Sequence, residues 1–362
     1  MGKLLILGNS SGGLYEFRNE LMLEMLQHHE VYISVPDEKR TKELEEEGCH
    51  IIKTHINRRG MNPVQDMGLV KSYMQLIGMV KPDLILTYTI KPNIYGGLCA
   101  NMLRVPYITN ITGLGTTFER GGMVKKLVVF LYRVALAKAV CVFFQNEDNK
   151  KIFEEHRIQG KKSRLIPGSG VNIYLHKEKP QPNNEKPRFL YVGRIMKEKG
   201  IDEYLYAAKV YQKEAEFGII GYYEEEYEEI IKDMGKDGLI QFYGYQNDVD
   251  SFYEKSDAII VPSYHEGMSN VVLEAASCGR PVLASYISGC KEAIDHRKTG
   301  FLFEPRNSQS LVDSIGELLK LSAKDREKMG QRARKKMERE FNRKLVVEAY
   351  MDEIEEILYE TY

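Results

Sequence analysis

Long apolar runs are absent from this sequence. No stretch of 18 or more uncharged apolar residues occurs, so a membrane-spanning helix is not expected. The first apolar stretch covers only about five residues before a glycine loop, whereas a secretory signal needs a longer apolar region and a small-residue cleavage site. We therefore expect a cytoplasmic protein.

Cysteine pairs and histidine clusters are also absent. The five cysteines of the 362-residue chain stand singly, and none belongs to a Cys-x-x-Cys pair. An odd, scattered set suits a reducing compartment and argues against a disulfide framework or a thiolate zinc site. The eight histidines show no ligand spacing. The sequence therefore predicts no bound metal and no cofactor.

Two nucleotide-binding signatures are missing. An NAD-dependent oxidoreductase needs Gly-x-Gly-x-x-Gly with an acidic residue about 20 positions on, and a P-loop ends in Gly-Lys-Ser/Thr. Neither pattern is present, but a glycine loop at Gly8–Gly13 follows the first apolar run and precedes a helical pattern. At Gly12 and Gly13 the backbone can approach a ligand closely, and a helix N-terminus there favours negative charge. The loop can equally be a plain turn.

Charge is divided unevenly along the chain. Residues 1–180 carry 25 Lys+Arg against 18 Asp+Glu, a net of +7, whereas the remainder carries 26 against 34, a net of −8. The basic half either indicates an acidic partner or reflects chance asymmetry, and the sequence leaves both readings open.

Short β-rich runs alternate with helical patterns, which is typical of a parallel sheet with helices on both faces. The alternation starts again after a proline-rich, aperiodic stretch at 171–187. We predict an α/β protein with two doubly wound, Rossmann-like domains, 1–170 and 188–341. A linker at 171–187 joins them, and a C-terminal helix at 342–362 can pack back on the first domain. The predicted strands are Lys3–Leu7, Val31–Val35, His50–Lys53, Asp83–Tyr88, Tyr107–Asn110, Val140–Phe144, Arg164–Ile166, Arg188–Val192, Phe217–Gly221, Ile240–Phe242, Ala258–Val261 and Pro281–Ala284.

The turn Val192–Gly200 (VGRIMKEKG) follows the first strand of the second domain directly. Ligands of open parallel sheets bind beyond the carboxyl ends of the strands. Arg194 and Lys199 flank this turn, and two cations beside free N–H groups suit a diphosphate. The alternative is a surface turn with solvated cations.

The loop and helix at Val261–Ala275 carry two glutamates. Glu266 lies in the loop, and Glu274 lies on the helix, which Ser269 is placed to cap. An ionised carboxylate accepts hydrogen bonds from both hydroxyls of a ribose. The N–H groups of Gly267–Asn270 would be free for phosphate or sugar oxygens. Two glutamates at this spacing are usually surface residues, but the setting after a strand argues for a ligand site.

Three segments, VGRIMKEKG, EGMSNVVLEAASCGRPV and IPGSGVN, together resemble the retaining family-4 glycosyltransferases of the GT-B fold. The resemblance covers nearly the whole chain. It implies that Glu274 holds the ribose of a UDP-sugar, that Arg194 and Lys199 hold the diphosphate, and that Glu266 faces the donor sugar. The catalytic candidates are then Arg194, Lys199 and Glu266, and the donor-binding set is Gly12, Gly13, Gly193, Arg194, Lys199, Glu266, Gly267, Met268, Ser269, Asn270 and Glu274.

TIKPNIYG and the stretch Asn110–Gly115 resemble the subgroup that builds capsular, O-antigen or lipid-linked glycans. This implies transfer of a hexose or N-acetylhexosamine to an acceptor linked to polyprenyl diphosphate. Many relatives place a histidine after the fourth strand, but this chain has TYTIKPN there, which puts that role in doubt. The acceptor-side candidates are Thr89, Lys91, Gly113 and Gly115.

The resemblance implies a front-face reaction without a covalent intermediate, in which Arg194 and Lys199 stabilise the departing phosphate. No divalent metal is needed where two cations hold the phosphates. A nucleotide-sugar 2-epimerase of the same architecture and a non-catalytic nucleotide-sugar-binding protein stay open as alternatives. A nucleic-acid partner is not expected.

The segment Lys125–Arg133 is apolar with cations at its ends. It could lie on an anionic membrane. For this helix we favour core packing with an ordinary basic edge. The basic first half as a whole still favours a peripheral role at the inner face of the plasma membrane.

Overall fold

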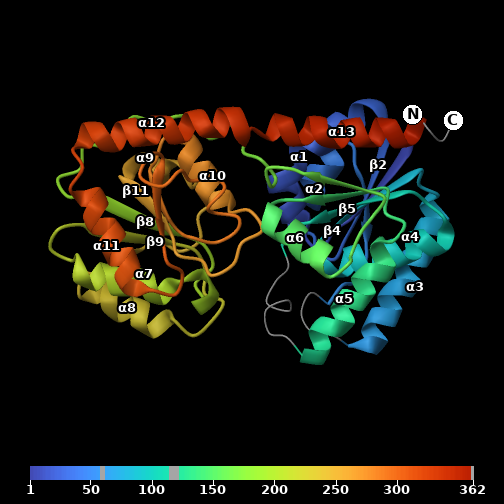
Figure 1. The fold of residues 1–362 in the computed structure, drawn as a ribbon, viewed down its shortest axis with the longest axis horizontal. Helices are drawn as coiled ribbons and strands as arrows, with labels where there is room; N and C mark the ends of the chain where they lie inside the picture. The colour runs from blue at the N-terminus through green and yellow to red at the C-terminus, as the bar shows by residue number, and fades with distance from the viewer. Residues whose placement is uncertain (58–61, 114–121, 360–362) are drawn as a thin grey trace. The chain divides into compact units, whose positions relative to one another are not determined.

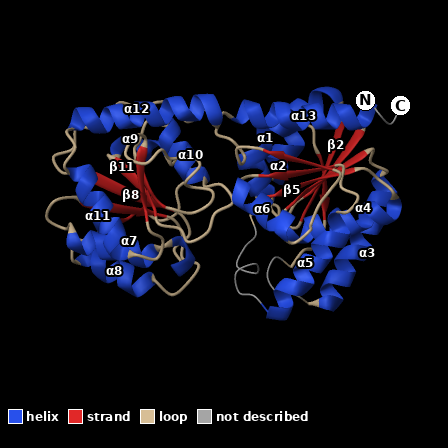
Figure 2. Ribbon diagram, in the orientation of Figure 1, coloured by secondary structure: helices blue, strands red, loops and turns tan. Residues whose placement is uncertain are grey.

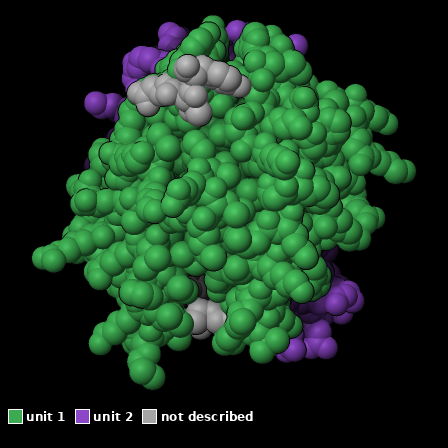
Figure 3. All heavy atoms as spheres, turned by 90° about the vertical axis from the view of Figure 1, so that its right-hand side faces the viewer, with its two compact units in different colours: residues 1–169, 344–362 green, residues 170–343 purple. Residues whose placement is uncertain are grey.

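The chain folds into two compact units, which Figure 3 colours separately. The computed structural model describes residues 1–57, 62–113 and 122–359. The first unit comprises residues 1–169 and 344–362, and the second comprises residues 170–343. None of the helices within the described ranges combines the length and the apolar character that crossing a membrane requires.

A seven-stranded parallel sheet of order β3-β2-β1-β4-β5-β6-β7 forms the first unit. Helices cover both of its faces (Figures 1 and 2), and a buried apolar cluster lies on each face. The strands are β1 (Lys3–Leu7), β2 (Glu30–Val35), β3 (His50–Lys53), β4 (Leu84–Tyr88), β5 (Tyr107–Ile111), β6 (Cys141–Phe144) and β7 (Lys162–Leu165). The helices are α1 (Ser11–His28), α2 (Thr41–Glu46), α3 (Pro63–Val80), the π-helical turn η1 (Pro92–Gly96), α4 (Gly97–Leu103), α5 (Gly122–Leu136), α6 (Glu147–Glu155) and α13 (Arg343–Tyr359), of which Arg343 is assigned to the second unit.

The helices of this unit start where the sequence supplies caps. Ser10 accepts a hydrogen bond from the Gly13 N–H at the start of α1, and Asn62 caps α3, in which Pro63 is the first residue. Helix α13 packs on the first sheet, because Tyr350 and Ile354 are fully buried in the same cluster as Leu4. The C-terminal helix thus belongs to the first unit.

The second unit has a six-stranded parallel sheet of order β10-β9-β8-β11-β12-β13. Buried clusters again lie on both faces. Its strands are β8 (Arg188–Val192), β9 (Glu216–Ile220), β10 (Gln241–Phe242), β11 (Ala258–Val261), β12 (Val282–Ser285) and β13 (Gly300–Phe303). Its helices are the 3-10 turn η2 (Lys197–Lys199), α7 (Ile201–Val210), α8 (Glu228–Lys236), α9 (Asp250–Lys255), α10 (Asn270–Ser277), α11 (Ser308–Leu319) and α12 (Ala323–Glu340).

Two features of the second unit differ from the sequence expectation. Strand β13 was not predicted. The stretch 171–187 is not a separate connection, because it packs on this unit. The Val171 N–H donates to the Phe341 carbonyl at 2.7 Å, and the Lys179 N–H donates to the Cys278 carbonyl at 3.1 Å.

Candidate active site

Two glycines, Gly200 and Gly221, allow the turn after β8 to pack closely against its neighbours. Gly200 has a φ of +72°, and a Cβ at this position would lie 2.0 Å from the Pro262 carbonyl oxygen at the end of β11. Gly221, after β9, packs equally closely against the start of this turn, because a Cβ at Gly221 would lie 1.8 Å from the Gly193 carbonyl oxygen. Only glycine permits these approaches. They bring the segment that carries Arg194 and Lys199 against the loop that carries Glu266.

Lys199 and Glu266 form an ion pair. Lys199 Nζ lies 2.6 Å from Glu266 Oε1, and the two side chains are 22% and 16% exposed. The sequence predicted both residues at the site, but it did not predict that they would form an ion pair with each other. The pair places a lysine that can bind phosphate beside a carboxylate at the carboxyl edge of β8 and β11.

Arg194 also has a carboxylate neighbour. Its guanidinium lies 3.6 Å from Glu224 Oε2, which is longer than an ordinary hydrogen bond. The Glu224 N–H donates to the Ile195 carbonyl at 3.1 Å, so the segment after β9 is tied to the turn after β8. Sequence analysis did not single out Glu224, which stands in an acidic stretch without a motif. Both predicted phosphate-binding cations are therefore matched by an acid.

Helix α10 begins beside the glutamate loop. Ser269 is its N-cap residue, but the structure records no capping hydrogen bond from its side chain. The Ser269 N–H donates to the Gly289 carbonyl at 2.8 Å, so the expectation that all N–H groups of Gly267–Asn270 are free is wrong at Ser269. Gly289 has a φ of +84°, and a Cβ there would lie 2.8 Å from the Gly267 carbonyl oxygen. The loop before β13 therefore supports the predicted donor loop, and Met268 is buried beneath it.

Glu274 lies on α10, and a tyrosine hydroxyl hydrogen-bonds to its carboxylate. The Tyr253 hydroxyl donates to Glu274 Oε2 at 3.2 Å. Burial raises the pKa of the Glu274 carboxyl, and the nearby His176 opposes this rise. Tyr253 itself is fully buried. A carboxylate fixed in this way can present its remaining acceptor positions to a diol.

His176 is a residue that the sequence analysis missed. Its Nδ1 lies 2.7 Å from Asp250 Oδ1. Burial lowers the pKa of His176, but the hydrogen bond to Asp250 and the charge of Glu274 outweigh this, and the pKa is raised overall. The three residues come from separate segments, so no local pattern could have revealed them.

Among the described residues, one group of three side chains could hold a metal ion: His176, Asp250 and Cys278, whose ligand atoms lie within 4.8 Å of one another. However, His176 Nδ1 already pairs with Asp250, and burial raises the pKa of the Cys278 thiol, which disfavours the thiolate that binds metal. The geometry therefore fits a buried polar pair better than a metal centre.

Hydrogen bonds to side chains of the first unit already occupy N–H groups of its glycine loop. The Gly13 N–H donates to Ser10 Oγ at 3.2 Å, and the Ser11 N–H donates to Asp37 Oδ1 at 3.2 Å. The Ser11 hydroxyl donates to the same carboxylate. A Cβ at Gly12 would meet no atom closer than 3.8 Å, so space remains beside it. The start of α1 is thus occupied by an acid, as expected for a helix end that attracts negative charge.

Two acceptor-side candidates follow β4. Thr89 has a φ of +73°, which is strained for a β-branched residue, and its buried hydroxyl has no hydrogen-bond partner within the described ranges. Lys91 Nζ lies 2.7 Å from Asp66 Oδ1 on α3. Gly113 is partly exposed after β5, and Gly115 lies outside the described residues. Because β1, β4 and β5 are neighbours, the candidates at Gly12, Thr89 and Gly113 share one edge of the first sheet.

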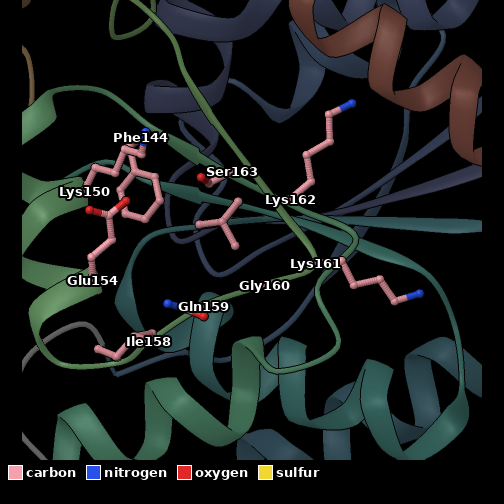
Figure 4. Close-up of a pocket in the computed structure, with 10 residues that line it drawn as sticks. Phe144, Lys150, Glu154, Ile158, Gln159, Gly160, Lys161, Lys162 and Ser163 are labelled. Carbon is pink, nitrogen blue, oxygen red and sulfur yellow. The ribbon is translucent and has the colours of Figure 1, made fainter.

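A hollow of about 150 Å³ lies elsewhere in the first unit (Figure 4). It is lined by β6, by α6 and by the residues that lead into β7. Lys162 on its rim pairs with Glu353 at 2.7 Å and Glu356 at 3.0 Å. No predicted site residue lines this hollow, so it is separate from the candidate site.

Two family models match most of the chain. The model described as glycosyl transferases group 1 matches residues 173–336, and the model described as glycosyl transferase 4-like matches residues 3–146. The two matched regions contain the two sets of candidate residues.

Curated relatives and a solved structure agree with these matches. The chain is 26% identical to N,N'-diacetylbacillosaminyl-diphospho-undecaprenol alpha-1,3-N-acetylgalactosaminyltransferase of Campylobacter jejuni, covering 86% of this chain and 88% of that protein. It is 23% identical to the capsular polysaccharide biosynthesis glycosyltransferase CapM of Staphylococcus aureus, covering 91% of each. The crystal structure of Anabaena Alr3699/HepE in complex with UDP and glucose superposes with a TM-score of 0.81 at 18% identity, covering 98% of this chain and 99% of that one.

The fold prediction of two Rossmann-like α/β domains is confirmed. The chain belongs to the group 1, family-4-like glycosyl transferases and is a glycosyltransferase of the GT-B fold.

Proposed function

We propose that the protein transfers a hexose or N-acetylhexosamine from a UDP-sugar, with retention, to a sugar carried on a polyprenyl diphosphate. The observation that carries the donor half is the Lys199–Glu266 pair beside the Arg194 turn, where two cations converge on one sheet edge. The acceptor half rests on the Campylobacter relative, whose name includes a diphospho-undecaprenol acceptor. The acceptor would be presented at the cytoplasmic face of a membrane.

In this proposal the donor diphosphate binds Arg194 and Lys199, and Glu274 accepts the ribose hydroxyls. The bond between C1 of the sugar and the phosphate oxygen breaks while the acceptor oxygen bonds to C1 on the same face. The acceptor's proton passes to the departing phosphate oxygen, so the products are UDP and the glycoside. A well-placed donor to that oxygen contributes about 3–4 kcal/mol. With two cations at the diphosphate, the reaction needs no divalent metal.

The test is product analysis with a panel of labelled UDP-sugars and a short-chain polyprenyl-diphosphate-linked sugar. We expect an acceptor-dependent α-linked product from one donor. Isomerised nucleotide-sugar without acceptor would instead identify a 2-epimerase, and binding without turnover would identify a sensor. Lys199→Gln should slow product formation by about 10²–10³-fold, whereas Lys209→Gln, which changes an exposed lysine of α7, should leave the rate unchanged.

A further inference from the structure

A cluster of polar side chains in the second unit connects three segments to Glu274. His176, from the stretch 171–187, places Nδ1 2.7 Å from Oδ1 of Asp250, the first residue of α9. Three residues further along α9, the Tyr253 hydroxyl donates to Glu274 on α10 at 3.2 Å. The side chains of His176 and Asp250 are only 14% and 21% exposed. Helix α9 is therefore bound to His176 at its start and to Glu274 one turn later.

The backbone of His176 is fixed to the helix that carries Glu274. The His176 carbonyl accepts a hydrogen bond at 2.7 Å from the hydroxyl of Ser277, the last residue of α10. Arg334 of α12 donates to the same carbonyl at 2.7 Å and to the Ser277 carbonyl at 2.9 Å. A change of the His176 side chain leaves these backbone contacts in place, so the role of the imidazole can be tested by itself.

Asp250 and Glu274 place two carboxyl groups in this partly buried cluster. Burial raises the pKa of the Glu274 carboxyl, and the charge of Asp250 raises it further. The charge of His176, the hydrogen bond from Tyr253 and the charge of Arg343 lower it. A carboxyl with a raised pKa takes up a proton sooner as pH falls, and the protonated form loses acceptor positions for a diol. Ionisation of Glu274 therefore depends on the cations beside it.

His176 gains charge in the direction in which Glu274 needs it. Burial lowers the pKa of His176, but the hydrogen bond to Asp250 and the charge of Glu274 outweigh burial and the opposing charge of Arg343. The pKa is raised overall, so the imidazolium becomes more fully populated as pH falls, while carboxyl groups gain protons. Cys278, whose sulfur lies in the same cluster, stays a neutral thiol because burial raises its pKa.

We propose that His176 is a positioning residue for the donor: paired with Asp250, it keeps the Glu274 carboxylate ionised and directed at the ribose hydroxyls. Asp250 orients the imidazole, and the imidazolium charge offsets the repulsion between the two carboxylates. The inference deepens the proposed function, because it rests on Glu274 binding the ribose. The preference for UDP over 2′-deoxy-UDP then persists at acidic pH only while residue 176 carries a positive charge.

The test is calorimetric titration of the full chain with UDP and with 2′-deoxy-UDP from about pH 8 to about pH 5.5, which spans the ordinary histidine pKa of about 6.5. The ratio of the two dissociation constants cancels the titration of the diphosphate itself. EDTA is present throughout, so a metal ion contributes nothing. Wild type should keep its ratio across this range. His176→Asn retains a donor for Asp250 but no charge, so its ratio should match wild type at about pH 8 and fall about tenfold at the acidic end.

A second substitution separates charge from packing. Asp250→Asn removes the repelling carboxylate, so the double variant His176→Asn with Asp250→Asn should recover the wild-type ratio at acidic pH. A purely structural role would give a loss at every pH and a larger loss in the double variant. His296→Asn is the matched control, because His296 Nδ1 accepts from the Leu302 N–H at 3.0 Å in the same unit. This variant should behave like wild type. Circular dichroism of each variant establishes that the fold is intact.

Three results would overturn the role of His176: His176→Asn keeps the wild-type ratio at acidic pH, it loses the same factor at every pH, or the double variant falls below the single one. A wild type that binds the two nucleotides alike would show that Glu274 does not bind the ribose 2′-hydroxyl, and the inference would fall with that assignment. The expected ratios without any sugar transfer in the product analysis would refute the proposed function and leave the role of His176 standing.

Discussion

Lys199 Nζ lies 2.6 Å from Glu266 Oε1, although 67 positions separate the two residues in the chain. The lysine charge is therefore balanced before any ligand arrives. A donor diphosphate has to share Lys199 with this carboxylate or displace it. In the proposed mechanism the diphosphate takes over the Lys199 ammonium and Glu266 turns toward the sugar. We therefore expect the two residues to respond differently to mutation.

Lys199→Gln should reduce kcat/KM by about 10²–10³-fold and weaken UDP binding, because the charge that stabilises the leaving phosphate is lost. Glu266→Gln should reduce kcat while UDP alone binds as tightly as before or more tightly, since a competing carboxylate is gone. Steady-state kinetics and calorimetric titration with UDP measure both effects. If Glu266→Gln weakens UDP as much as Lys199→Gln does, the division of roles is wrong.

Much of the fold could be predicted, because buried parallel strands read as short continuous apolar runs. LILTY of β4 and AIIV of β11 are buried throughout and were found within a residue of their ends. Strand β13, GFLF, was missed because it is short and no helical pattern separates it from the charged segment that precedes it. The packing of 171–187 was missed because it depends on backbone hydrogen bonds to distant residues.

The site shows the same limit. Motifs singled out Arg194, Lys199 and Glu266 in the segments that follow β8 and β11, and Glu274 on the next helix, α10. Their partners Glu224, Tyr253 and His176 come from segments without a motif, and only the folded sheet order brings them together. Sequence therefore singled out the candidate ligand-binding groups but not the side chains that position them.

Glu274→Ala should weaken UDP binding by roughly 2–5 kcal/mol, because a charge-assisted contact to the ribose is removed. The wild type should bind 2′-deoxy-UDP less tightly than UDP, and the variant should bind the two alike. Tyr253→Phe should cost less, about 1 kcal/mol, because it removes only one hydrogen bond behind the carboxylate. Calorimetry with both nucleotides checks this. If wild type and Glu274→Ala prefer UDP over 2′-deoxy-UDP to the same extent, Glu274 does not bind the ribose 2′-hydroxyl.

Arg194→Lys should lower kcat/KM by at least about tenfold, since a point charge cannot replace the planar fork on two phosphate oxygens. Activity should survive excess EDTA if Arg194 and Lys199 suffice for the diphosphate. The assay is initial rate with and without chelator, for wild type and variant. Loss of wild-type activity in EDTA, with recovery on adding magnesium or manganese, would contradict the metal-free mechanism.

His176 predicts a pH-dependent contribution to stability. The pKa of His176 is raised in the folded protein, so protonation favours folding. Its stabilisation should be full below the unfolded pKa of about 6.5 and should disappear as pH rises through the folded pKa. The difference in unfolding free energy between wild type and His176→Asn should therefore shrink with rising pH in denaturant titrations. Asp250→Asn should weaken this pH dependence of the unfolding free energy, because Asp250 supplies the hydrogen bond to His176. An unchanged pH dependence would show that Asp250 does not raise the pKa of His176.

Gly200→Ala tests whether the turn that carries Arg194 and Lys199 depends on its contact with β11. Gly200 and Gly238 have nearly the same φ, +72° and +69°, but a Cβ at Gly200 would lie 2.0 Å from the Pro262 carbonyl oxygen, whereas one at Gly238 meets nothing within 4 Å. Both substitutions incur the backbone strain of about 1 kcal/mol, and only Gly200→Ala adds the clash, so it should cost about 3 kcal/mol or more. Chemical denaturation measures both variants. Since the clash would push the turn away from Pro262, Gly200→Ala should also weaken UDP binding, and Gly238→Ala should not. Equal losses of stability in the two variants would mean that the turn can move off β11 without cost.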